Sequence, residues 1–323
     1  VDPAWPAPLK DTDPSGRTVA LMQGSLNILH AAGLADFIAE HGTEMRQMRI
    51  IDDSIAGQEP LVSDFDAFDI GQDYFGRNIP NSSLRAVLYE RAQEISGVTL
   101  HEGKLHDLDG AFARLEDGSE IDARLIVGAD GRGSLVRSFA GIGVHKKPYD
   151  QSAITCIINH SRAHDFTSTE FHREGGPFAL VPMQGNQSSV VWVEKTAQSD
   201  ALMALPKDAF EQALQGATND VLGGVTLASS PKSWPLCAIT AKNFTAARVA
   251  LIAEAAHVMS PITAQGLNLS LRDVASLCEV IVDARRLGQD FGAAGVLRGY
   301  DRSAAGCDDA HGGGEWDEPD CEQ

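Results

Sequence analysis

Apolar residues recur at helical spacing in several stretches of the chain. Between positions 19 and 29 they return every three or four residues and predict a helix that ends at Gly33, a residue suited to a left-handed C-terminal position. A second stretch, from Leu84 to Ile95, follows Ser82 and Ser83, either of which can cap a helix. Further helices are expected over 207–214 and 268–286.

Strand-like segments lie between these helices. Asp117-Gly118 separates two β-prone runs, 111–115 and 120–123, and predicts a hairpin because Asp-Gly suits a type I′ turn. Residues 125–127 and 247–252 are short apolar runs, as expected of strands buried on both faces. Residues 46–80 predict short strands and turns. The block 151–195 holds strand-like runs at 154–158, 178–181 and 189–193, and predicts an antiparallel sheet in a lobe of its own.

The strand at 125–127 runs directly into a glycine-rich turn, Gly128 to Gly133, and then into a helix that starts near Ser134. Glycines let a backbone approach a ligand closely, and the free N–H groups of a helix start favour an anion. Asp130 lies where a carboxylate can accept hydrogen bonds from a ribose. For this segment alone, an ordinary strand-to-helix turn is an equally good interpretation.

The strand at 247–252 ends in the same way, at the carboxylate of Glu254. A loop with Pro261 and Gly266 then leads into a helix that starts near Leu267. A helix start that faces a ligand stabilises negative charge on it. His257 alone is typical of a packed, hydrogen-bonded histidine, but the order of features in the whole run indicates a ligand-binding loop.

The charge balance excludes some classes of partner. Asp and Glu number 45 and Lys and Arg 26, which gives a net charge of −19. Nucleic-acid binding depends largely on Lys and Arg contacts to phosphates, so we expect no nucleic-acid partner. The same charge argues against adsorption to anionic lipid. His160 and His164 lack a carboxylate in metal-site spacing, and we expect no bound metal.

The apolar and cysteine residues favour a cytoplasmic protein. Hydrophobic residues make up 43% of the chain, as is typical of soluble globular proteins. We find no run long enough to span a bilayer and no signal peptide. The five cysteines form no CxxC pair, so we expect reduced thiols.

The two strand-loop-helix runs together resemble the class A flavoprotein monooxygenases, which have the para-hydroxybenzoate hydroxylase fold. The first run resembles that family's Asp-Gly motif, and the second its later flavin motif, usually Gly-Asp-Ala-Ala-His followed by Pro and Gly-Gln-Gly-Leu-Asn. The segment 16–21 is similar to the family's arginine-bearing segment, and 176–182 and 191–194 are similar to strands of its substrate lobe. The subgroup of closest resemblance is the 2-polyprenyl-6-methoxyphenol hydroxylases of ubiquinone biosynthesis.

This resemblance implies an α/β fold with a three-layer FAD- and NAD(P)-binding domain and an inserted antiparallel substrate lobe. The FAD-binding domain would comprise 1–48, 80–145 and 246–302, and the substrate lobe 49–79 and 146–245. The resemblance implies that Arg17 contacts the FAD pyrophosphate and that Gly128, Asp130 and Gly131 serve FAD and NADH or NADPH. It implies that Glu254 holds ribityl or ribose hydroxyls. Four further residues would lie against the isoalloxazine: Pro261, Gly266, Leu267 and Asn268.

The chain departs from the family pattern at three places. It has no GxGxxG motif and begins about where the family's second strand ends, so we expect an N-terminally truncated chain without the first βαβ elements. Glu254 stands where the family has an aspartate. Residues 303–323, which hold Gly312 to Gly314 and little that is apolar, predict a disordered or artefactual tail.

The function implied is hydroxylation of an aromatic ring with O2 and NAD(P)H, on a polyprenylated phenol of ubiquinone biosynthesis. No side chain stands out as a catalytic acid or base. Peripheral association with the inner membrane or with a multi-enzyme assembly is compatible with such a substrate. Two alternatives stay open: a non-catalytic fragment or pseudoenzyme that does not retain FAD, and another flavin monooxygenase on the same scaffold.

Overall fold

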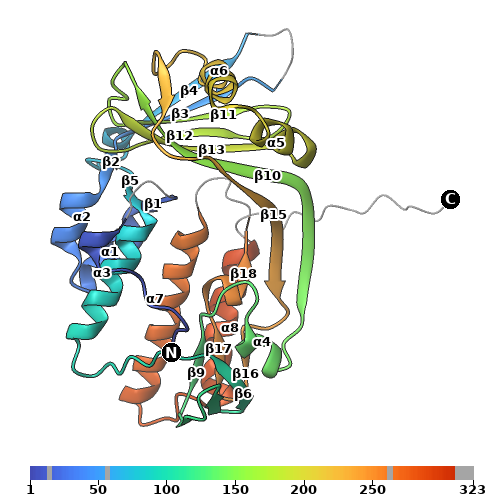
Figure 1. The fold of residues 1–323 in the computed structure, drawn as a ribbon. Helices are drawn as coiled ribbons and strands as arrows, with labels where there is room; N and C mark the ends of the chain where they lie inside the picture. Colours follow the sequence, from blue (N-terminus) through green and yellow to red (C-terminus); the bar gives the residue numbers. More distant parts are fainter. Residues whose placement is uncertain (13–16, 55–58, 260–264, 310–323) are drawn as a thin grey trace. The chain divides into compact units, whose positions relative to one another are not determined.

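The computed structural model describes residues 1–12, 17–54, 59–259 and 265–309, with side chains up to residue 302. The chain divides into two compact units. The first comprises 1–103, 146–238 and 259–269, and the second comprises 104–145, 239–258 and the residues from 270 onward. Figure 1 labels the elements of both. The division predicted from the sequence into a cofactor domain and a substrate lobe stays a prediction.

The first unit is built on a large, mostly antiparallel sheet. Its neighbouring strands run in the order β15-β10-β13-β12-β11-β3-β4, and β14 also pairs with β10. The antiparallel pairing of β10, β13, β12 and β11 confirms the sheet predicted over 151–195. The strands are β3 (Gln47–Asp52), β4 (Leu61–Asp66), β10 (Val144–His160), β11 (Thr167–His172), β12 (Phe178–Pro182), β13 (Gln187–Lys195), β14 (Val225–Leu227) and β15 (Lys232–Ala241).

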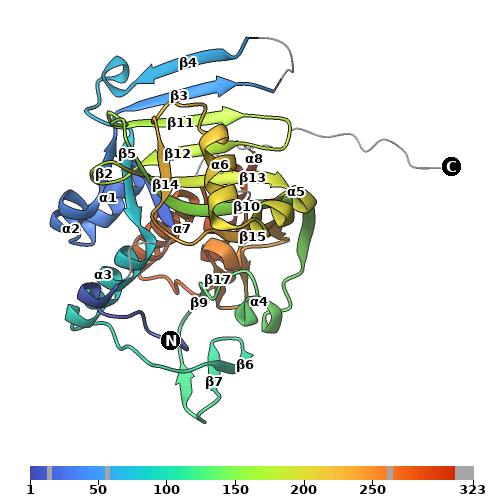
Figure 2. The ribbon, with the colours of Figure 1, turned by 45° about the horizontal axis from the view of Figure 1, so that its top comes forward.

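One face of this sheet is covered by helices. α5 (Thr196–Met203) and α6 (Lys207–Ala217) place Leu202, Phe210 and Leu214 in a core with residues such as Val190 and Trp192 of β13. Figure 2 shows α6 lying across the strands. Because successive side chains of a strand point to opposite faces, Ser189 and Val191 point to the other face. The helix predicted over 207–214 is confirmed, whereas α5 was not predicted.

A smaller sheet of the first unit has the order β1-β5-β2, formed by β1 (Thr18–Met22), β5 (Gly76–Pro80) and β2 (Thr43–Met45). The helix predicted over 19–29 is wrong in its first half. Residues 18–22 pair with β5 along their whole length, and α1 (Gln23–Ala31) begins only after them. Gly76 permits this close pairing, since a Cβ there would lie 2.1 Å from the Leu21 carbonyl oxygen. The remaining elements of this part of the chain are η1 (Leu9–Asp11), α2 (Ala35–His41), η2 (Ala67–Ile70) and α3 (Asn81–Glu94), of which α3 confirms the second predicted helix.

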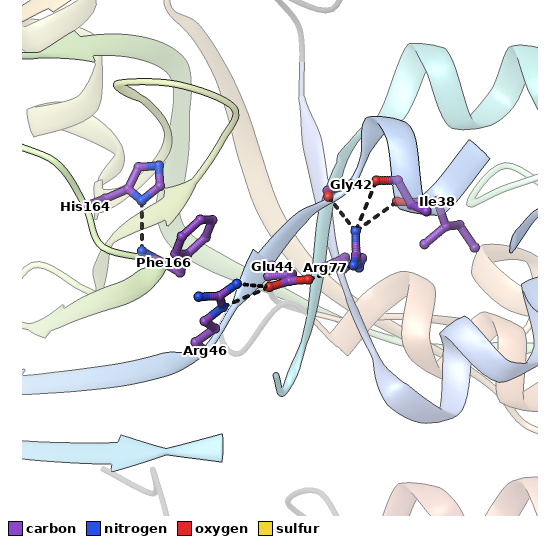
Figure 3. A network of polar contacts seen from close by, with 8 residues as sticks. Ile38, Gly42, Glu44, Arg46, Arg77, His164 and Phe166 are labelled. Carbon is purple, nitrogen blue, oxygen red and sulfur yellow. Dashed lines mark hydrogen bonds and ion pairs between the residues drawn. The ribbon is translucent and has the colours of Figure 1, made fainter. Parts of the chain in front are cut away.

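An ion-pair network joins α2, β2 and β5 in this unit. The Glu44 carboxylate accepts hydrogen bonds from Arg77 (2.8 Å) and Arg46 (2.8 Å), as Figure 3 shows. Arg77 also donates to the carbonyl oxygens of Gly42 and Ile38 at the end of α2. The Arg77 side chain is 15% exposed and that of Arg46 48%. Arg77 is therefore the inner partner of the pair.

The second unit contains two small sheets. In the first, β9 (Ile126–Gly128) pairs in parallel with β17 (Val249–Leu251), which also pairs with β16 (Thr245–Ala246). The second is the meander β6 (Leu105–Asp109), β7 (Phe112–Leu115) and β8 (Glu120–Asp122), which confirms the predicted hairpin. Residues of both sheets, of α4 (Leu135–Phe139) and of α8 (Ala294–Asp309) share one core. β17 is buried along its length as predicted, but Val127 of β9 is 41% exposed.

Four further features complete the fold. η3 (Ala253–Ala255) and β18 (His257–Val258) follow β17, and β18 pairs with the end of β15. α7 (Gln265–Arg286) confirms the predicted long helix. α8 runs to Asp309, so residues 303–309 of the predicted tail are helical, and 310–323 lie outside the described residues. Within the described part of the chain, no helix is both long and apolar enough to cross a membrane.

Candidate functional site

The carboxylate of Asp130 caps α4 in the structure. It accepts hydrogen bonds from the Ser134 hydroxyl (2.5 Å) and from the backbone N–H groups of Leu135 (2.7 Å) and Val136 (3.1 Å). Ser134 in turn accepts from the Arg137 N–H. These bonds satisfy N–H groups that a helix start otherwise leaves free. The predicted ligand residue therefore also fixes the turn that carries it.

Two positions of this turn require glycine for different structural reasons. Gly131 has a φ of +79°, a conformation that side-chain-bearing residues rarely adopt, and apart from its chain neighbours no atom of the described residues lies within 4 Å of its Cβ position. A Cβ on Gly128 would instead lie 2.9 Å from atoms of Leu251 and Val136. Gly128 thus serves the packing of β9, whereas the backbone at Gly131 has open space beside it.

Glu254 lies in the turn that follows β17. The turn begins at Ala253, whose φ is +56°, and its N–H donates to the carboxylate of Asp273 (2.8 Å) on α7. The same carboxylate oxygen is 2.7 Å from Nε2 of the buried His257. The Glu254 side chain itself is 49% exposed. The backbone of the turn is thus fixed by buried groups while its carboxylate stays accessible.

The structure brings the Asp130 turn and the Glu254 turn together. β9 and β17 are parallel neighbours, so their carboxyl ends meet at one edge of the sheet. Arg132 of the first turn lies 3.5 Å from the Glu254 carboxylate. The buried Arg137 donates to the carbonyl oxygens of Ala255 (2.8 Å) and Arg132 (2.9 Å) and so ties both turns to one side chain.

The other described candidates lie in the first unit, around β1. Arg17 is exposed just before β1, with its guanidinium 5.3 Å from the centre of the Trp234 ring. Gly266, Leu267 and Asn268 form the first turn of α7. The buried Asn268 side chain accepts from the Met22 N–H (2.9 Å) and donates to the Ala20 carbonyl (2.9 Å). Pro261 lies outside the described residues.

The chemistry of these groups fits a dinucleotide with two phosphates and free hydroxyls. Arg17 is an exposed cation suited to phosphate, and Glu254 is an exposed acceptor suited to hydroxyl groups. The open space beside Gly131 and beside Gly266 leaves room for close backbone contact. An exposed cation and an exposed carboxylate of the kinds that a dinucleotide can pair with are therefore present among the described candidates.

Three residues of importance were not predicted from the sequence. Arg137 and Asp273 lie on helices and reach the two turns only through the tertiary fold. Asn78, in β5, is 2% exposed, and its side-chain oxygen has no hydrogen-bond partner among the described residues. A signal was present for Asn78, since an amide inside a short strand that precedes a helix cap is unusual.

Comparison with known proteins gives relatives along most of the chain. A family described as FAD binding domain matches residues 9–289. The chain is 36% identical over 291 residues to the ubiquinone hydroxylase UbiL of Rhodospirillum rubrum, a match that covers 88% of the chain and 67% of that relative. It is 29% identical over 307 residues to the 3-demethoxyubiquinol 3-hydroxylase of Escherichia coli, covering 93% of the chain and 77% of the relative. A match to the ubiquinone hydroxylase UbiM of Neisseria meningitidis covers 63% of that relative, so the chain spans about two thirds of several such proteins.

The structure is also similar to solved structures. It matches Pseudomonas aeruginosa PqsL in complex with 2-aminobenzoylacetate at a TM-score of 0.77 and 22% identity, over 93% of this chain and 84% of that one. Another structure of PqsL carries the description of a probable FAD-dependent monooxygenase. This likeness confirms the mixed α/β fold class.

Proposed function

The chain belongs to the family of flavin monooxygenases that carry an FAD binding domain, and from this membership we propose that it hydroxylates an aromatic ring with NAD(P)H and O2. The observation that carries the proposal is the match over residues 9–289, together with relatives named as ubiquinone hydroxylases. We propose a polyprenylated phenol as the substrate.

The residues of the chain would bind and orient the flavin. Arg17 would pair with the pyrophosphate, and Glu254 would accept hydrogen bonds from ribityl or ribose hydroxyls. The backbone N–H groups at the start of α7, near Gly266 and Leu267, would stabilise negative charge on the flavin. When bound, the flavin supplies electron transfer from the nicotinamide and activation of O2.

Glu254 acts from a rigid support in this proposal. Asp273 fixes the backbone at Ala253 and Arg137 fixes the carbonyl of Ala255, so the residue between them has a defined backbone position. Arg132 is its exposed ionic partner, which a ligand can replace because an exposed ion pair contributes little stability. The additional methylene of glutamate relative to aspartate is accommodated by this exposure.

Oxygen incorporation tests the proposal. The chain is mixed with FAD, NADH or NADPH, isotopically labelled O2 and a 2-polyprenylphenol, and the products are analysed by mass spectrometry. We expect one labelled oxygen atom in the phenol product, and less product from Glu254→Gln because FAD is bound more weakly. Glu279→Gln, an exposed carboxylate of α7, is the matched control. Unlabelled product, or oxidation of NAD(P)H with no product, contradicts the proposal.

A comparison of two substrates tests the alternative that the chain is another flavin monooxygenase on the same scaffold. If the chain hydroxylates 4-hydroxybenzoate but not the prenylated phenol, it is another flavin hydroxylase on the same scaffold.

A further inference from the structure

A pocket of about 480 Å3 lies within the first unit, on the side of the large sheet that α5 and α6 do not cover. Its lining includes Pro80 of β5, Ile157 of β10 and Met183 after β12. Ile157 alternates with Cys156 and Ile158, which belong to the helix-covered core, so its side chain points to the opposite face. The volume is in the range of about 300–1,000 Å3 that is usual for small-molecule sites.

Asn78 lines this pocket and is incompletely hydrogen-bonded. Its amide nitrogen donates to the Pro182 carbonyl (3.0 Å) and approaches the Ser189 hydroxyl (3.4 Å). The nearby Pro182 carbonyl can only accept, which fixes the orientation of the amide. The side-chain oxygen is left buried with no partner among the described residues. Such a group is costly to leave unpaired, so a donor that enters the pocket gains by pairing with it.

The pocket lies near the segment expected at the flavin. Asn78 is directly opposite Ala20 in the β1–β5 pairing. The carbonyl of Ala20 in turn accepts a hydrogen bond from Asn268, in the first turn of α7. One strand pairing and one side-chain hydrogen bond therefore connect Asn78 to the residues that we assign to the isoalloxazine.

We propose that the side-chain oxygen of Asn78 accepts a hydrogen bond from the hydroxyl group of the aromatic substrate and so selects substrates whose ring carries a free hydroxyl. The proposal rests on the proposed function, because it assumes an aromatic substrate in this pocket. A phenol hydroxyl donates to an amide oxygen, whereas the corresponding methyl ether has no proton to donate. Asn78 is thus a specificity-determining residue that favours phenols over their ethers.

Binding of matched probes to the full chain tests this role without turnover. Isothermal titration calorimetry compares 2-allylphenol with 2-allylanisole, its methyl ether, which lacks only the donor. One hydrogen bond to a buried acceptor predicts that the wild-type chain binds the phenol about tenfold more tightly. Equal affinities for the two probes in the wild-type chain overturn the proposal, and this result needs no variant.

Substitution locates the effect at Asn78. In Asn78→Leu the preference for the phenol should fall to about twofold or less, because the acceptor is gone. Asn27→Leu, which changes an exposed amide of α1 outside the pocket, should keep the full preference. Circular dichroism verifies that both variants are folded. A folded Asn78→Leu chain that keeps the tenfold preference also overturns the proposal.

The two proposals fail in different experiments. If the chain discriminates the probes through Asn78 but incorporates no labelled oxygen into a phenol, the pocket assignment holds and the hydroxylase assignment fails. If it hydroxylates phenols but binds both probes equally, the hydroxylase assignment holds and the pocket assignment fails.

Discussion

At the scale of single residues, the two turns of the candidate site are held by side chains whose polar atoms are already paired. Asp130 caps α4, Arg137 joins the carbonyls of both turns, and Asp273 holds the N–H of Ala253. The side chain of Glu254 is by contrast half exposed. Glu254 is therefore the carboxylate of these turns best placed to bind a ligand, and Asp130 would bind one only while still capping its helix.

Ala253 has a left-handed backbone that a glycine adopts more easily. Its φ is +56°, and the related flavin motif usually has glycine at this place. We predict that Ala253→Gly stabilises the chain by about 0.5–1 kcal/mol in urea unfolding, because relief of the Cβ strain exceeds the added entropy of the unfolded chain.

Ala255→Gly is the control for Ala253→Gly, and it is expected to change the stability in the opposite direction. Ala255 lies in the same turn, is fully buried and has no positive φ. Ala255→Gly should therefore destabilise the chain by about 1 kcal/mol. Destabilisation by Ala253→Gly as well would show that the turn carries no relievable strain.

His160 predicts a pH dependence of stability. Its ring is buried, Nδ1 lies 2.8 Å from the Arg162 carbonyl, and the His164 ring is near. Burial lowers the pKa of His160, so the unfolded chain takes up a proton at a higher pH than the folded chain does. The stability contributed by the neutral ring is therefore complete above about pH 6.5 and is lost as the pH falls below it.

Urea titrations checked at several pH values measure this effect. The urea concentration at which half of the wild-type chain is unfolded should decrease as the pH is lowered from about 7 to about 5.5. This decrease should be smaller in His160→Gln. His30→Gln, at an exposed position of α1, serves as the control. An identical decrease in wild type and His160→Gln would rule out His160 as its source.

At the scale of elements, the local sequence pattern predicted most helices and strands. It failed where pairing with a distant strand determines the secondary structure. Residues 18–22 have apolar spacing compatible with a helix, yet they form β1 because β5 pairs with all five of them. That pairing depends on Gly76, far away in sequence, so no local pattern reveals it. α5 was missed because its eight residues are too few to show a helical period.

In the candidate site too, contiguous segments were predicted from the sequence and residues brought in by the tertiary fold were not. The turns at 128–131 and 253–254 were predicted because each is a contiguous run with glycine or a carboxylate after a strand. Their supports, Arg137 and Asp273, were not predicted. The parallel register of β9 and β17 brings Arg137 to the second turn, and Asp273 reaches that turn from α7. Asn78 was not singled out despite its unusual place in a short strand, and it became a candidate through its pocket and a side-chain oxygen with no partner among the described residues.

The link between α2 and β5 makes a further prediction. Arg77 and Arg46 share Glu44, but Arg77 is largely buried and also binds the end of α2 (Figure 3). Arg77→Met should cost about 2–3 kcal/mol of unfolding free energy, because it removes the less exposed partner of Glu44 and leaves the part-buried Gly42 carbonyl without this donor. Arg46→Met should cost less than about 1 kcal/mol, as an exposed ion pair does. Equal losses in the two variants would contradict this division of roles.

At the scale of the whole molecule, the acidic net charge disfavours one class of partner but does not identify the actual partner. A net charge of −19 still disfavours nucleic acid, but part of it comes from residues 310–323, which lie outside the described structure. The family assignment instead rests on the span 9–289. The chain as a whole is thus best characterised by its flavin-related fold rather than by its charge.

Retention of flavin by the purified chain tests the central claim most directly. The chain is incubated with FAD, freed of unbound FAD by gel filtration, and measured by visible absorption before and after addition of NAD(P)H. The flavin assignment predicts a protein-bound flavin spectrum that bleaches with the reductant and is weaker in Glu254→Gln than in Glu279→Gln. A wild-type chain that emerges with no flavin absorption would contradict it and identify a non-catalytic relative of the flavin hydroxylases.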